Sequence, residues 1–149
     1  MSDKVKVGSN AKKYLSRPYY IKQKIEDKEA EIENLRGMLG NKAVQLKTDK
    51  VKSSNIGGAE PDIIASICDI EKEIDELYSK YNEIMLENKK VIESIPDPMQ
   101  ERVMHRYFIA MNTIGEIADE FGYSVRHTYR LYSDALEYIE LNLLTDIES

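Results

Sequence analysis

Near the C-terminus, a short run of side chains has the chemistry needed to contact a nucleic acid. The segment from Tyr123 to Ser133 holds two arginines, a histidine and several hydroxyl groups, and it contains no Asp or Glu. An arginine can donate two hydrogen bonds to guanine, a valine can contact the thymine methyl group, and hydroxyl groups can donate to phosphate oxygens. Tyr132 is a further candidate for a phosphate contact. The candidate DNA-binding residues are Ser124, Val125, Arg126, His127, Tyr129, Arg130 and Ser133.

The spacing of small residues around this segment is typical of a helix-turn-helix. Ala118 allows two helices to approach closely, and four residues later Gly122 can adopt a left-handed turn without a Cβ penalty. Thr128 stands at the inward-facing position of the second helix, ten residues after Ala118. Thr113 and Glu116 have the spacing of a capping box, which predicts the start of the first helix. We therefore expect the candidate residues to lie on the outer face of a recognition helix.

Two long helices are expected before this region. Residues 18–39 have isoleucines and leucines at steps of three and four, interrupted by Lys28. Residues 40–61 are rich in Lys, Ser, Asn and Gly, and we expect them to form a long connecting loop. A second long helix follows and ends before Pro96, which lacks a backbone donor.

The second helix carries the clearest pattern in the chain, an apolar seam of four heptads. The seam can pack on residues 18–39 within the chain, or it can pack between chains. Asn88 occupies a core position, where asparagine can fix the register of a parallel dimer. We expect a hairpin whose exposed edge dimerises. The seam positions are Ile67, Ile70, Ile74, Leu77, Tyr81, Ile84, Asn88, Val91 and Ile95.

The predicted fold class is therefore all-α. Residues 18–95 form a long helical hairpin or coiled coil, and residues 96–149 form a three-helix domain with the helix-turn-helix. Residues 1–17 are basic, and we expect them to be a flexible leader; contact with DNA phosphates is the alternative.

Charge and composition exclude several classes of protein. The net charge of −6 rules out a uniformly basic nucleic-acid binder, although residues 1–52 carry 13 Lys and Arg against 7 Asp and Glu. Cys68 is the only cysteine, which fits a reducing cytosol; we expect its thiol to be at least half-buried beside the seam. With no apolar run long enough to span a membrane and no signal peptide at the N-terminus, we expect a cytoplasmic protein.

No residue set points to catalysis. His105 and His127 lie 22 residues apart, and a zinc site would need further ligands at fixed spacing. The sequence contains no recognisable nucleophile with its base and no glycine-rich phosphate loop. We expect neither enzymatic activity nor a metal or cofactor.

The stretch "IPDPMQERVMHRYFIAMNTIGEIADEFGYSVRHTYRLYSDALEYI" resembles region four of bacterial sigma factors, over about residues 95–141. The chain resembles more closely the ArpU/RinA-type transcriptional regulators of phages of Gram-positive bacteria. Arg106-Tyr107 and Glu116-Ile117-Ala118 match the motifs of the module, as do Gly122 and Ser124. The family shares a coiled-coil-like N-terminal part. Thr113-Ile114 replaces the commoner threonine-tryptophan, and the recognition helix is less basic than in most sigma modules.

The resemblance implies a phage-encoded DNA-binding transcriptional regulator, an activator of late genes, acting in the cytoplasm of a bacterial host. Its implied partners are double-stranded DNA, host RNA polymerase and a second copy of the chain. No part of the sequence resembles the promoter-melting regions of a full sigma factor, so we expect that the chain cannot replace one. The target DNA sequence is not inherited from the family. Two alternatives stay open. One is a helical interaction protein that docks on RNA polymerase or another phage protein. The other is a DNA-packaging subunit similar to small terminases.

Overall fold

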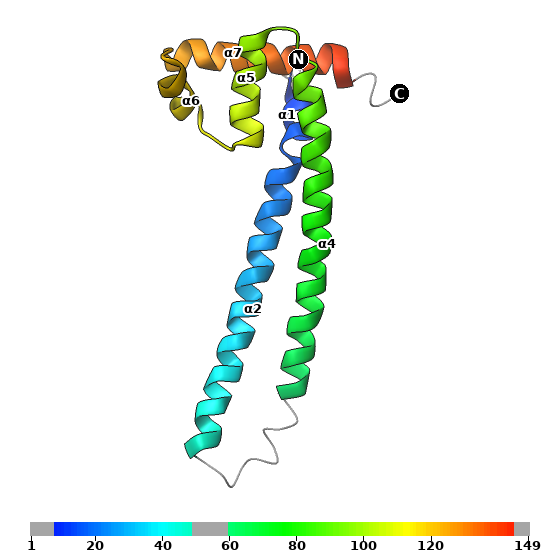
Figure 1. Ribbon diagram of the computed structural model, residues 1–149, viewed down its shortest axis with the longest axis vertical. Coiled ribbons are helices and arrows are strands. Elements are labelled where there is room, and N and C mark those ends of the chain that lie inside the picture. The colour runs from blue at the N-terminus through cyan, green and yellow to red at the C-terminus, as the bar shows by residue number, and fades with distance from the viewer. Residues whose placement is uncertain (1–7, 49–59, 145–149) are drawn as a thin grey trace, which may run out of the picture. The chain divides into compact units, whose positions relative to one another are not determined.

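The computed structural model describes the backbone of residues 8–48 and 60–144, and the side chains of residues 8–40 and 60–144. Every regular element in these ranges is a helix, which confirms the all-α fold class (Figure 1). The helices are α1 (Ser9–Leu15), α2 (Arg17–Thr48), α4 (Glu60–Glu93), α5 (Pro98–Met104), η2 (His105–Ile109), α6 (Ile114–Phe121), α7 (Val125–Tyr138) and η3 (Ile139–Leu143); η2 and η3 are π-helical.

The chain divides into two compact units, one of residues 1–19 and 82–149 and the other of residues 20–81. In the second unit, α2 and α4 form an antiparallel hairpin. Its buried core draws isoleucines from both helices, so the apolar seam packs within the chain here. Lys28, which interrupts the stripe of α2, forms an ion pair with Glu73 across the hairpin. The buried core residues are Ile25, Ile32, Ile63, Ile67, Ile70 and Ile74.

The loop expected over residues 40–61 is wrong at both of its ends. α2 continues to Thr48, and α4 already begins at Glu60; residues 49–59 lie outside the described part of the chain. Gly40 does not stop the helix, because one glycine costs a helix only about 1 kcal/mol. The α2 backbone therefore continues through residues 41–48, whose composition suggested a loop.

The first unit departs from the expected division at residues 17 and 95. Residues 9–15, expected in a flexible leader, form α1, whose Ala11 and Leu15 are buried. They share a core with the end of α4 and with the C-terminal helices. That core also contains Val91, Ile92, Ile95, Val103, Met104, Phe108, Ile117, Tyr132, Ala135, Leu136, Ile139 and Leu144. The C-terminal domain thus includes a part of the chain that the sequence assigned elsewhere.

Within the ranges described, no helix is both long and apolar enough to cross a membrane.

Candidate nucleic-acid interface

The turn between α6 and α7 has the geometry that the sequence predicted. Thr113 and Glu116 form the reciprocal capping box at the start of α6. Gly122 ends α6 in the left-handed conformation, with φ 73° and ψ 28°, and a Cβ there would carry the usual steric cost. The Tyr123 amide donates to the Ala118 carbonyl oxygen at 3.0 Å. Ser124 then begins α7 by accepting a hydrogen bond from the His127 amide.

The inward residues of the motif are buried as expected. Ala118 is 2% exposed and Thr128 is fully buried. The Thr128 hydroxyl donates to the Ser124 carbonyl oxygen at 3.0 Å, so this polar group is satisfied without water. With Thr128 fixed inward, the rotation of α7 about its own axis is set.

The opposite face of α7 carries the predicted DNA-binding residues on its first turns. Val125 is 58% exposed and Tyr129 is 55% exposed. Arg126 and Arg130 form no ion pair with any residue for which the structure gives a position. Of the seven candidates, six are exposed and one is half-buried. The exposed ones are Ser124, Val125, Arg126, His127, Tyr129 and Arg130, and the half-buried one is Ser133.

The arginines of α5 and η2 have partners within the domain. Arg106 forms an ion pair with Glu120 at 2.9 Å, and the Arg102 guanidinium lies 4.5 Å from the centre of the Phe121 ring. The hydrogen bond from Arg106 lowers the pKa of Glu120 and keeps that carboxylate ionised. In α6, Glu116 has a lowered pKa for a different reason, because the Thr113 backbone amide donates to it. Glu116 and Glu120 thus interact with neighbouring groups of the domain, Thr113 and Arg106 respectively.

Tyr123 contributes to the face although the sequence did not single it out. Its ring meets the His127 imidazole edge to face, with centroids 4.8 Å apart and planes at 82°. It also lies edge-on to Phe121, at 6.3 Å. Tyr123 is half-buried and sits in the turn, so it restricts the orientation of an exposed histidine that would otherwise be free to rotate. The capped turn before Ser124 was the signal in the sequence that could have identified it.

The prediction that Tyr132 donates a hydrogen bond to a phosphate is wrong, because its side chain is buried. Its side chain is 4% exposed and its ring packs 4.7 Å from that of Tyr107. Within the described chain its hydroxyl has no hydrogen-bond partner in range. Burial raises the pKa of Tyr132, and the neighbouring Tyr107 phenol adds to the effect. Tyr132 follows Thr128 by four residues, which places it on the same inward face.

Asn88 packs within the chain, and Cys68 differs from expectation. The Asn88 side chain is fully buried, and its amide donates to the Leu15 carbonyl oxygen at 3.0 Å. This hydrogen bond engages the Asn88 side chain within the chain. Cys68 is exposed because it follows the buried seam residue Ile67 by one position. His105 is half-buried, and no three His, Cys, Asp or Glu side chains of the described ranges are grouped closely enough to hold a metal ion.

Comparisons with protein-family models, curated proteins and solved structures found no significant match to the chain. The function is therefore inferred from the residues and geometry described above.

Proposed function

We propose that the protein is a DNA-binding transcriptional regulator that reads duplex DNA in the major groove through the first two turns of α7. The observation that carries the proposal is the exposed, acid-free face with two arginines that have no carboxylate partner in the described structure. A major groove about 12 Å wide accepts an α-helix, and its base edges offer acceptors to a guanidinium. The capped turn and the buried Thr128 present this face as a rigid unit.

Each residue of the face has a distinct role in the proposal. Arg126 and Arg130 donate to guanine, and Val125 contacts a thymine methyl group. Ser124 and Tyr129 donate to phosphate oxygens and fix the position of the helix on the duplex. His127, held by Tyr123, contacts a base edge or a phosphate.

The resemblance to the ArpU/RinA-type regulators favours a phage-encoded activator of late genes, acting in the bacterial cytoplasm with host RNA polymerase as a partner. A homodimer through the helical part belongs to the same proposal. Ile67, Ile70 and Ile74 of the seam are buried in the hairpin core, and Val91 and Ile95 are buried in the core of the first unit. Dimerisation would therefore have to use other residues. Exposed apolar side chains on the two long helices include Ile64, Tyr78 and Leu86 of α4, at 51%, 45% and 61%, and Met38 of α2, at 48%.

A second candidate, docking on a protein, is favoured by the two large apolar side chains exposed on the same face, Val125 and Tyr129. One experiment separates the two functions. The full chain is incubated with a random pool of DNA duplexes, bound sequences are recovered over several rounds, and the winner is tested by gel shift. Enrichment of one sequence motif supports DNA reading. Failure to enrich any motif, together with capture of RNA polymerase after nuclease treatment, would replace it with docking.

A further inference from the structure

The short helix α1 is capped at both ends by side chains that are distant in sequence. At its N-terminus Gly8 offers no side chain, and the Glu140 carboxylate takes over the capping function. One oxygen of Glu140 accepts from the Ala11 amide at 3.0 Å, and the other accepts from the Asn10 side-chain amide at 3.1 Å. A carboxylate at this end also complements the helix dipole.

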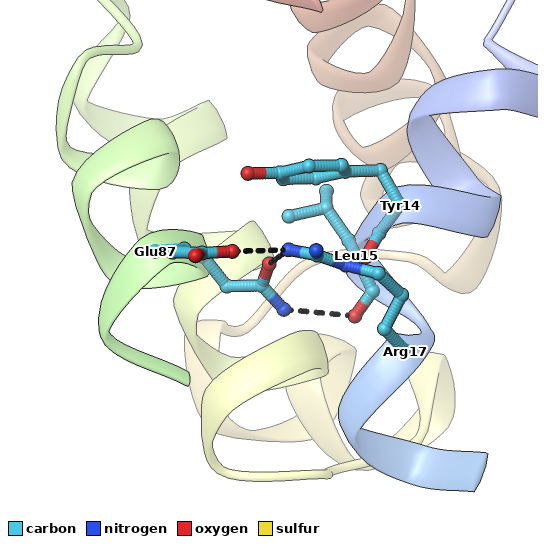
Figure 2. A network of polar contacts seen from close by, with 5 residues as sticks. Tyr14, Leu15, Arg17 and Glu87 are labelled. Atoms are coloured by element: carbon cyan, nitrogen blue, oxygen red, sulfur yellow. Dashed lines mark hydrogen bonds and ion pairs between the residues drawn. The ribbon is translucent and has the colours of Figure 1, made fainter. Parts of the chain in front are cut away.

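The C-terminal end of α1 has carbonyl groups that the following helix cannot satisfy. Pro18 has no N–H, so it cannot bond to the Tyr14 carbonyl oxygen as a continuous helix would require. The Arg17 side chain supplies that hydrogen bond through Nε at 2.8 Å. The next carbonyl, that of Leu15, accepts from the Asn88 side-chain amide at 3.0 Å. A dashed line ends at this Leu15 oxygen in Figure 2.

Arg17 joins these contacts into one network with the end of α4 (Figure 2). Its guanidinium forms an ion pair with Glu87 at 3.0 Å and approaches the Asn88 side-chain oxygen at 3.4 Å. The same guanidinium lies over the Tyr14 ring, with Arg17 Cζ 3.8 Å from the centre of the ring. The polar network therefore anchors the break between α1 and α2 to α4.

The packing of α1 is equally specific. Ala11 is 0% exposed and Leu15 is 1% exposed, both within the core of the C-terminal domain. At Gly8, where φ is 102°, an added Cβ would lie 3.1 Å from the Leu136 Cβ of α7. The surface that receives α1 thus selects a helix with Gly, Ala and Leu at positions 8, 11 and 15.

We infer that α1 is a strap that folds only while it is docked on α4, α7 and η3, and that Asn88 holds it there. A helix of seven residues is too short to be stable alone in water. The caps supplied by Glu140 and Asn88 come from its docking site, so undocking removes them together with the buried contacts. The receiving surface is a docking site for a short helix, and residues 9–15 of this chain are its occupant. The inference does not depend on whether α7 reads DNA.

Hydrogen exchange of the full chain tests the strap, because it reports local opening separately from global unfolding. The Lys12 and Ser16 amides donate within α1 and exchange when it opens. In the native protein we expect them to exchange faster than the amides of α5 and α7. In Asn88→Leu, the leucine fills the buried position but cannot donate to the Leu15 carbonyl oxygen. We expect exchange in α1 to rise about tenfold while α5 and α7 keep their protection.

Asn82→Leu is the matched control, since Asn82 is an exposed asparagine of the same helix. It should leave exchange in α1 unchanged. Glu140→Ala removes the other cap at a half-buried position, and it should reproduce the faster exchange of α1 even if Asn88→Leu fails to fold. The inference is overturned if α1 amides exchange at the rate of the α5 and α7 core in the native protein. It is also overturned if both cap variants leave α1 exchange unchanged.

Discussion

At the scale of single residues, the four arginines of α5, η2 and α7 separate into two kinds. Arg102 and Arg106 lie against Phe121 and Glu120 and stabilise the packing of α6. Arg126 and Arg130 stand on the exposed face of α7 without a partner among the described residues. A guanidinium without an acid nearby has its donors available for a ligand, which is why the proposed function depends on the second pair.

We predict that Tyr123 affects DNA reading through His127. Tyr123→Ala and His127→Ala should each weaken binding to the selected duplex by about three- to tenfold, the range of one aromatic contact. The double variant should lose no more than either single variant, and Tyr123→Phe should bind like the native protein, because its ring still meets the imidazole. The measurement is a double-mutant cycle of dissociation constants at one salt concentration. Additive losses would show that Tyr123 does not act through His127.

Tyr132→Phe should preserve or increase stability, by at most about 1 kcal/mol, because it removes a buried hydroxyl that has no partner among the residues described. The raised pKa of Tyr132 has its own consequence. Folding favours the neutral phenol, so its contribution to stability is present below the ordinary value of 10.0 and is lost as the pH rises above it.

Urea unfolding at pH 7 and again above pH 10 measures both effects. The native protein should lose more stability between the two conditions than Tyr132→Phe does. A loss of more than about 2 kcal/mol in the variant at pH 7 would instead mean that the hydroxyl is hydrogen-bonded.

The helical period accounts for how well single residues were predicted. Once Thr128 was assigned inward, the exposure of Arg126 and Tyr129 followed from 3.6 residues per turn. The same rule places Tyr132 inward, yet its hydroxyl suggested a phosphate donor. The contact between Tyr123 and His127 could not be predicted, because side-chain torsions decide it and a residue pattern does not contain them.

At the scale of elements, local signals were reliable where a short motif closes on itself. The capping box at Thr113 and the left-handed turn at Gly122 involve neighbours in sequence and were predicted correctly. α1 was missed because its caps, Glu140 and Asn88, lie more than 70 residues away in the chain. Its helicity depends on tertiary contacts, which no local pattern of residues 1–17 records.

Two carboxylates of α6 predict how the stability of the protein depends on pH. The pKa values of Glu116 and Glu120 are lowered, by the Thr113 amide and by Arg106 respectively. Folding therefore favours their ionised forms, and this contribution is present above the ordinary value of 4.5 and is lost as the pH falls through the lowered pKa values. The temperature of the thermal midpoint of the native protein should therefore decrease as the pH is lowered below 4.5.

Replacing both carboxylates by Glu116→Gln and Glu120→Gln should flatten that fall, measured by circular dichroism from pH 3 to 7. The exposed Glu137→Gln is the matched control and should retain the native profile. A double variant as acid-sensitive as the native protein would assign the effect to other groups.

At the scale of the whole molecule, the charge is uneven, because an acidic chain contains an acid-free segment at α7. The net charge is −6, yet the segment from Tyr123 to Ser133 has no acid. An acidic chain binds DNA weakly without sequence preference, because that mode depends on the number of phosphates neutralised. Binding through α7 should therefore depend on base contacts more than on bulk charge. The hairpin of the second unit adds to the negative charge through its exposed acids such as Asp69 and Asp75.

The most direct measurement is the affinity of the double variant Arg126→Ala, Arg130→Ala for the selected duplex, by fluorescence anisotropy at fixed salt. Arg36→Ala is the control, since Arg36 is an exposed arginine of the hairpin, 3.4 Å from Glu71. The account predicts that the double variant loses at least about 30-fold in affinity, because each arginine contact to a base contributes about 1–3 kcal/mol. Its circular dichroism spectrum and the binding of the control should stay unchanged. Native affinity in the double variant would contradict the account.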